Sequence, residues 1–82
     1  MAIGTSAKAL TTTWQNVGTG PLFMQRQGSG NIRFAIQATE PAADDPGFSM
    51  DASSPEFSVT VAENVWARAV NGTARVVVAT LA

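Results

Sequence analysis

The sequence predicts an all-β protein: a small antiparallel β-sandwich or barrel of the jelly-roll or Ig-like kind, with about six to seven short strands. Apolar side chains recur at every second position in several runs, as in half-buried strands, and no run shows the helical period. Gly, Pro, Asn and Asp separate these runs at short intervals, which is typical of turns between strands. At 82 residues, the chain has the length of one small domain.

The composition favours an assembled state over a free monomer. Charged residues make up 13% of the chain, about half the usual share, so charge protects the surface poorly against association. The net charge is −1, with no run of Lys or Arg, so we expect binding neither to nucleic acid nor to a membrane. Because there is no cysteine, stability has to come from packing or oligomerisation.

The first residues differ from the rest of the chain. Residues 1–7 (MAIGTSA) are small, uncharged and aperiodic, which predicts a flexible N-terminal arm followed by a single β domain over residues 8–82. No apolar segment has the features of a signal peptide or the length of about 20 residues that spans a bilayer. We therefore expect a soluble protein made in the host cytoplasm.

Three runs in the first half predict strands. Residues 8–17 (KALTTTWQNV) place Leu10, Thr12 and Trp14 on one face. Residues 22–27 (LFMQRQ) and 31–38 (NIRFAIQA) alternate in the same way, and the Gly28-Ser29-Gly30 loop between them predicts a hairpin. These glycines are better explained by turns than by a phosphate-binding loop, because no Lys-Ser/Thr pair or helix start follows them.

A polar insertion follows at residues 39–47 (TEPAADDPG), where two prolines exclude a regular strand and the aspartates favour turns. Residues 48–50 (FSM) predict a brief strand or an anchored loop. The next strand is predicted at residues 56–61 (EFSVTV), with Phe57, Val59 and Val61 pointing inward.

Residues 65–81 (VWARAVNGTARVVVATL) predict a second hairpin, closed by Asn71-Gly72 in a type I′ turn. This register sets Arg68 opposite Arg75. Both faces of such a hairpin carry apolar side chains, so we expect both to be covered. One face would hold Val65, Ala67, Ala69, Ala74, Val76 and Val78, and the other Trp66, Arg68, Val70, Thr73, Arg75, Val77 and Ala79.

The second of these faces is the predicted interface with another chain. Its proposed contact residues are Trp66, Arg68, Val70, Arg75 and Val77. Two arginines directly opposed in a ladder destabilise it unless their heads splay into solvent or a carboxylate binds them. That carboxylate could come from Glu40, Asp44 or Asp45, in the same chain or in a neighbour. Trp14 is expected in the core, whereas Trp66 could lie in the core or at an interface.

The residue inventory argues against catalysis. The chain has no His, Cys or Tyr, so the usual general bases and nucleophiles are missing, and most carboxylates lie in predicted turns. We therefore expect no enzyme and no cofactor. Asp44, Asp45 and Asp51 could approach a calcium ion, but their spacing matches no EF-hand loop, so no metal site is predicted.

The stretch FSVTVAENVWARAVNGTARVVV resembles the C-terminal part of small virion proteins of tailed bacteriophages, and GPLFMQRQGSGNIRFAIQATEPAADDPGFSM is similar to their middle portion. The resemblance covers roughly residues 8–81. It implies a capsid decoration or cement protein on the capsid surface of the virion, a β-sandwich that is often a trimer and binds the major capsid protein.

A second function remains open from the residues alone. A phage tail or fibre module, or a carbohydrate-binding β-sandwich, would stack a sugar ring on an exposed aromatic such as Trp66 or Phe48. Loop Asp and Asn side chains would then bond the sugar hydroxyls.

Overall fold

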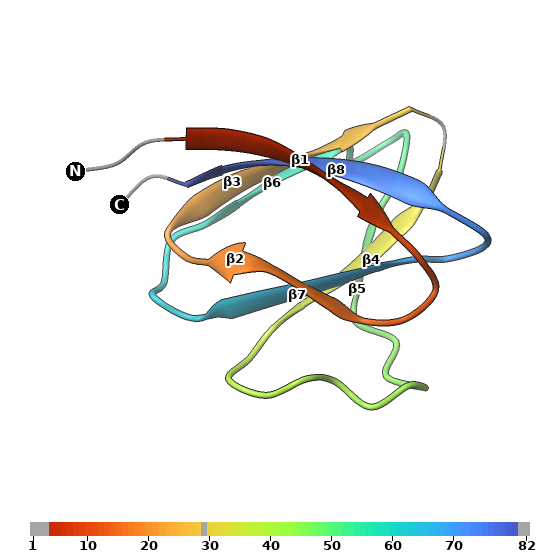
Figure 1. Cartoon of the computed structure of the whole chain (residues 1–82), viewed down its shortest axis with the longest axis horizontal. Coiled ribbons are helices and arrows are strands. Elements are labelled where there is room, and N and C mark those ends of the chain that lie inside the picture. The colour runs from red at the N-terminus through yellow and green to blue at the C-terminus, as the bar shows by residue number, and fades with distance from the viewer. Residues whose placement is uncertain (1–3, 29, 81–82) are drawn as a thin grey trace.

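The computed structural model describes residues 4–28 and 30–80 and shows an all-β sandwich. Two four-stranded antiparallel sheets form its layers (Figure 1). The strands are β1 (Gly4–Leu10), β2 (Gln15–Thr19), β3 (Leu22–Gln27), β4 (Ile32–Ile36), β5 (Phe48–Met50), β6 (Glu56–Val59), β7 (Asn64–Ala69) and β8 (Ala74–Thr80). The predicted fold class is confirmed, although the described residues form more strands than the six or seven expected.

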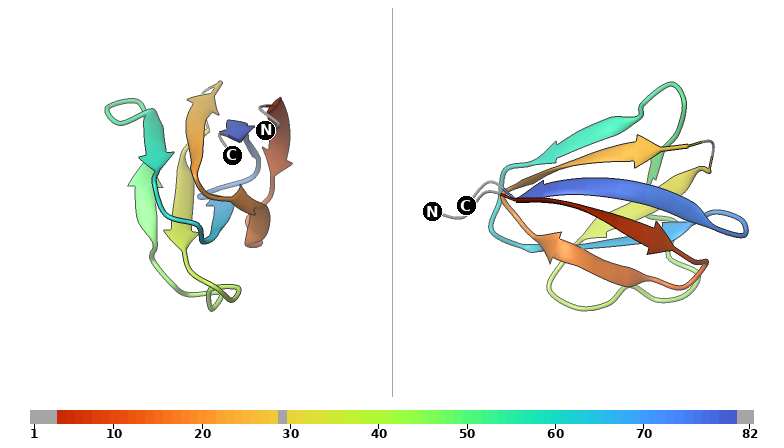
Figure 2. Two further views of the ribbon diagram at one scale, coloured as in Figure 1. Left: turned by 90° about the vertical axis from the view of Figure 1, so that its left-hand side faces the viewer. Right: turned by 45° about the horizontal axis from the view of Figure 1, so that its top comes forward.

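The chain passes back and forth between the layers. Sheet A has the strand order β1-β8-β3-β6, and sheet B has the order β2-β7-β4-β5. Every connection between consecutive strands therefore crosses from one sheet to the other, except the one that joins β4 to β5. Figure 2 shows the two layers and the links that close their ends. Apart from β4 and β5, consecutive strands therefore lie in different sheets instead of pairing.

The core lies between the sheets and follows the predicted alternation. Inward-facing side chains of β7 and β8 meet across the layers, and the face predicted for them is buried throughout. The buried hydrophobic cluster comprises Leu10, Val17, Leu22, Met24, Ile32, Phe34, Met50, Val59, Val65, Ala67, Ala69, Ala74, Val76 and Val78. Burial of such side chains provides the main stabilisation of a domain this small, at roughly 1.5–3 kcal/mol for each large one.

The predicted 65–81 hairpin is wrong in its pairing. β7 pairs with β2 and β4, whereas β8 pairs with β1 and β3. Gly72 has φ 60°, but Asn71 keeps a negative φ, and a type I′ turn requires positive φ at both positions. The Asn71-Gly72 segment therefore links the two sheets, and Arg68 and Arg75 are not neighbours.

Three other predictions about elements also change. The 22–27 and 31–38 strands form no hairpin, because β3 lies in sheet A and β4 in sheet B. Residues 8–17 are not one strand but the end of β1, a corner and the start of β2. Gly4 to Ala7 belong to β1 instead of a flexible arm; residues 1–3 of that predicted arm lie outside the described residues.

Candidate interaction surfaces

The five predicted interface residues do not share one face. Trp66 and Arg68 lie on the outer face of sheet B, whereas Arg75 and Val77 lie on the outer face of sheet A, on the opposite side of the molecule. Val70 lies in the connection between β7 and β8, where its N–H donates to the carbonyl of Asn31. Whatever each of them binds, they cannot form a single contact surface within one chain.

The outer face of sheet B is covered by the chain itself. Residues 37–47 form a loop that lies over this face, and four side chains from outside the loop donate to its carbonyls, one of them Asn64, whose Nδ2 donates to the Ala38 carbonyl at 3.1 Å. Trp14 Nε1 donates to the Ala42 carbonyl at 2.9 Å, and Trp66 Nε1 donates to the Gln37 carbonyl at 3.0 Å. Arg33 Nη1 donates to the Pro46 carbonyl at 2.9 Å. Trp14 is only 5% exposed, so it is buried as predicted, but under this loop instead of between the sheets.

An opposed arginine pair does exist, between different partners. Arg68 lies opposite Arg33 in the β4–β7 ladder. The Arg68 guanidinium carbon lies 5.3 Å from the centroid of the Trp14 ring, within the range of a cation–π interaction. Arg33 bonds the loop carbonyl instead. A ring face and a backbone carbonyl thus stabilise the pair, in the place where we expected a carboxylate.

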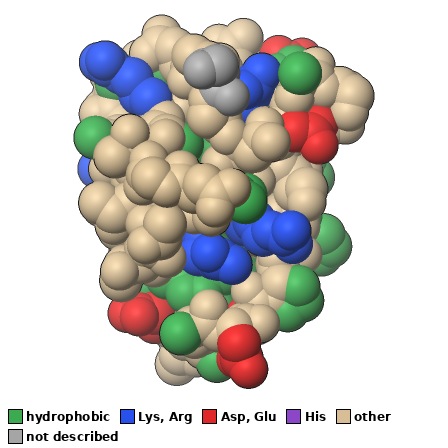
Figure 3. Space-filling view, turned by 90° about the vertical axis from the view of Figure 1, so that its right-hand side faces the viewer, with side chains coloured by type: hydrophobic (Ala, Val, Ile, Leu, Met, Phe, Trp, Pro, Cys, Tyr) green, Lys and Arg blue, Asp and Glu red, His purple; other side chains and the backbone are tan. Residues whose placement is uncertain are grey.

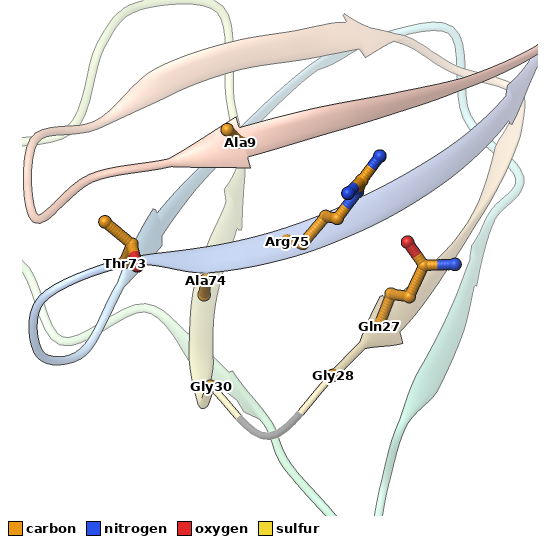
Figure 4. A pocket seen from close by; sticks show the side chains of 7 residues that line it. All are labelled: Ala9, Gln27, Gly28, Gly30, Thr73, Ala74 and Arg75. Carbon is orange, nitrogen blue, oxygen red and sulfur yellow. The ribbon is translucent and has the colours of Figure 1, made fainter.

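The outer face of sheet A bears the more accessible arginine. Arg75 pairs with Ala9 on one side and with Gln27 on the other. It borders a shallow depression of about 560 Å³, in which Arg75 and Gln27 project to the same side (Figure 4). The lining consists of Ala9, Gln27, Gly28, Gly30, Thr73, Ala74 and Arg75. Figure 3 shows several basic side chains on the end of the molecule that carries the β7–β8 connection. An exposed guanidinium beside an amide could receive a carboxylate of a partner.

A second surface lies where the sandwich is open. β5 and β6 are edge strands of different sheets, and Figure 2 shows them on the same flank. Phe48 is 62% exposed and Phe57 is 39% exposed, although Phe57 was predicted to point into the core. Their ring centroids lie 5.6 and 4.7 Å from that of the buried Phe34. We call Phe34, Phe48 and Phe57 the aromatic flank.

The aromatic flank was not predictable from alternation. Phe48 pairs with the buried Phe34, and Phe57 pairs with the buried Met24. Both phenylalanines therefore point to the inner side of their sheets. They remain exposed because each strand is the last in its sheet, so no further strand covers them. Val61, also predicted inward, is exposed as well and follows the end of β6. A sequence pattern gives the face of a strand but not its position in the sheet.

The aspartates serve turns. Asp45 Oδ1 accepts the N–H of Gly47, and Asp51 Oδ1 accepts the N–H and hydroxyl of Ser53. The Ser53 hydroxyl bond, followed by the backbone N–H bonds, lowers the pKa of Asp51 below its usual 3.8. Asp44, Asp45 and Asp51 belong to no group of metal-ligand type, since the described residues contain no cluster of three or more such side chains.

Comparisons with protein-family models, with curated proteins and with solved structures identified no match to this chain. In the described part of the chain, no helix is long and apolar enough to cross a membrane.

Proposed function

We propose that this chain is a structural virion protein that self-associates and binds the capsid surface as a decoration or cement protein. The sequence resemblance to small phage virion proteins suggests this role, and the low share of charged residues favours association. The observation that carries the proposal is the aromatic flank, because it offers a protein partner an apolar surface that the monomer leaves uncovered.

The aromatic flank is suited to protein binding in two ways. Full burial of a phenylalanine side chain contributes on the order of 1.5–3 kcal/mol, so covering Phe48 and Phe57 would supply useful binding free energy. Their contact with Phe34, which is fixed in the core, limits the conformational freedom that binding would otherwise remove. We assign this flank to the major capsid protein and treat Phe48 as its central contact.

Capsids of the encoding phage that lack this protein provide the test. Adding the wild-type protein should raise the temperature at which these capsids disrupt. Phe48→Ala should weaken binding at least about tenfold, equivalent to about 1.4 kcal/mol, and should leave the fold intact because the side chain is largely exposed.

Val77→Ala is the matched control, since Val77 lies on the outer face of sheet A and was in the predicted interface. It should bind capsids like the wild type. If Val77→Ala loses binding while Phe48→Ala keeps it, the shell contacts sheet A instead. If the wild-type protein neither binds nor stabilises the capsids, the proposed function is wrong.

Self-association is the other half of the proposal, and the trimer implied by the resemblance stays a prediction. Light scattering at low micromolar concentration should give a mass above the 8.5 kDa of one chain. A clean monomer would contradict this half.

The exposure of Phe48 also keeps carbohydrate binding as a second candidate. A glycan array tests this candidate. Binding that disappears in Phe48→Ala would favour this candidate over the capsid role.

A further inference from the structure

The outer edge of β1 is the longest unpaired strand edge among the described residues. β1 ends the order of sheet A and pairs with β8 alone. Its seven residues follow an unbroken register from the Gly4–Thr80 pair to the Leu10–Ala74 pair. The residues from Thr5 to Ala9 are all exposed. A regular edge of this kind presents unpaired N–H and C=O groups to another strand.

The other three edges carry features that hinder such pairing. β2 has a register shift between Asn16 and Gly18, and a bulge of this kind twists an edge away from a partner. β5 has only three residues. β6 has four, follows Pro55 and begins with a charged residue, Glu56. Short, bulged, Pro-flanked and charged edges are the usual protection against edge pairing, and β1 is longer and more regular than any of them.

We propose that β1 pairs in antiparallel fashion with β1 of a second copy, which joins sheet A of the two copies into one continuous sheet. This inference rests on the self-association in the proposed function and names its contact. It is a two-fold contact, so its product is a dimer, distinct from the trimer that the resemblance implies.

The side chains of β1 suit a copy of themselves. A two-fold axis through the edge sets the two strands antiparallel, the arrangement already present between β1 and β8. Lys8 is the strand's only charged residue, and edge lysines can oppose pairing. With the axis at Ala7, however, Lys8 would face Ser6 of the other copy, and with the axis at Ser6 it would face Gly4. Neither register opposes like charges directly, and the exposed side chains of β1 other than Lys8 are small enough for close approach.

Introducing a positive or a negative charge at residue 7 tests the β1–β1 contact. In both registers the two copies of residue 7 are cross-strand or diagonal neighbours, within about 8 Å. Ala7→Lys and Ala7→Glu should therefore each weaken self-association about tenfold. An equimolar mixture of the two variants should return to within about threefold of the wild type, because opposite charges then meet. Analytical ultracentrifugation or light scattering over a concentration series measures the self-association affinity of each variant and of the mixture.

Ala52→Lys and Ala52→Glu are the controls, since Ala52 is exposed in a turn away from β1. They should associate like the wild type. The inference is overturned if the Ala7 variants also associate like the wild type, or if the mixture fails to recover. A wild-type trimer unaffected by the Ala7 charges would overturn the β1 contact but leave the proposed function in place, whereas loss of capsid binding by the wild type would overturn the proposed function alone.

Discussion

At the scale of single residues, Gly47 combines a left-handed backbone with close packing. It has φ +57°, and a Cβ there would lie 2.7 Å from the Phe34 carbonyl oxygen and 3.0 Å from Trp14 Cη2. Gly72 has nearly the same φ, +60°, but a Cβ there would meet nothing within 4 Å. The two glycines therefore separate the cost of a left-handed backbone from the cost of a steric clash.

Gly72→Ala should destabilise the protein by about 1 kcal/mol, the cost of placing a non-glycine residue at positive φ. Gly47→Ala should cost about 3 kcal/mol or more, because the new methyl group also clashes with backbone. Urea denaturation of the two variants measures the difference. Equal losses would mean that the 37–47 loop shifts freely to admit the methyl group.

At the scale of elements, the 37–47 loop partly covers the outer face of sheet B. The loop is polar and contains two prolines, so it forms no regular structure by itself. Its position depends on hydrogen bonds from side chains beneath it, among them Trp14, Trp66 and Arg33. The loop thereby covers Trp66 and Arg68, which the sequence had assigned to an interface between chains. We accordingly expect substitutions at these tryptophans to affect folding before assembly.

Trp14→Phe should lower the free energy of unfolding by about 1–3 kcal/mol. It leaves the Ala42 carbonyl without its donor and weakens the interaction with the Arg68 guanidinium. Trp66→Phe should cost less, about 0.5–1.5 kcal/mol, because Trp66 is only half-buried and water can replace its bond to Gln37. Urea denaturation ranks the two variants, and the reverse order would show that Trp66 is the main anchor of the loop.

At the scale of the whole molecule, pairing joins distant parts of the chain. β1 and β8, at opposite ends of the described residues, form the longest ladder, and the crossing connections leave two open flanks. β5 and β6 border one of these sides, which carries the aromatic flank, and β1 and β2 border the other. In the proposed assembly, the capsid would therefore contact one side of the molecule and a second copy the other.

Self-association should make thermal stability depend on protein concentration, because an assembly that forms only from folded chains stabilises the folded state by mass action. The midpoint of thermal unfolding of the wild type should rise by several degrees between about 5 and 500 μM, on the basis of about 4–8 °C per kcal/mol for a domain of this size. Differential scanning calorimetry measures it. In Ala7→Lys the rise should be largely lost, and a midpoint independent of concentration in the wild type would contradict self-association.

The sequence by itself determined the all-β class, the inward face of β7 and β8, and the turns at the aspartates. These are local properties: side chains alternate along any strand, and short polar residues bond the adjacent backbone. The predicted pairing of Arg68 with Arg75 was wrong, because it depended on which strands pair, and Arg68 lies opposite Arg33 instead.

The tertiary structure alone decided which strands pair, and therefore which residues lie on the surface. A strand that leaves Asn71-Gly72 can return beside its predecessor or cross to the facing sheet, and both choices bury the same alternate side chains. The outcome depends on competition with β1, β2, β3 and β4 for the same backbone hydrogen bonds, which is a property of the whole chain. Exposure of Phe48 and Phe57, the cover over Trp66 and the free edge of β1 all follow from that choice.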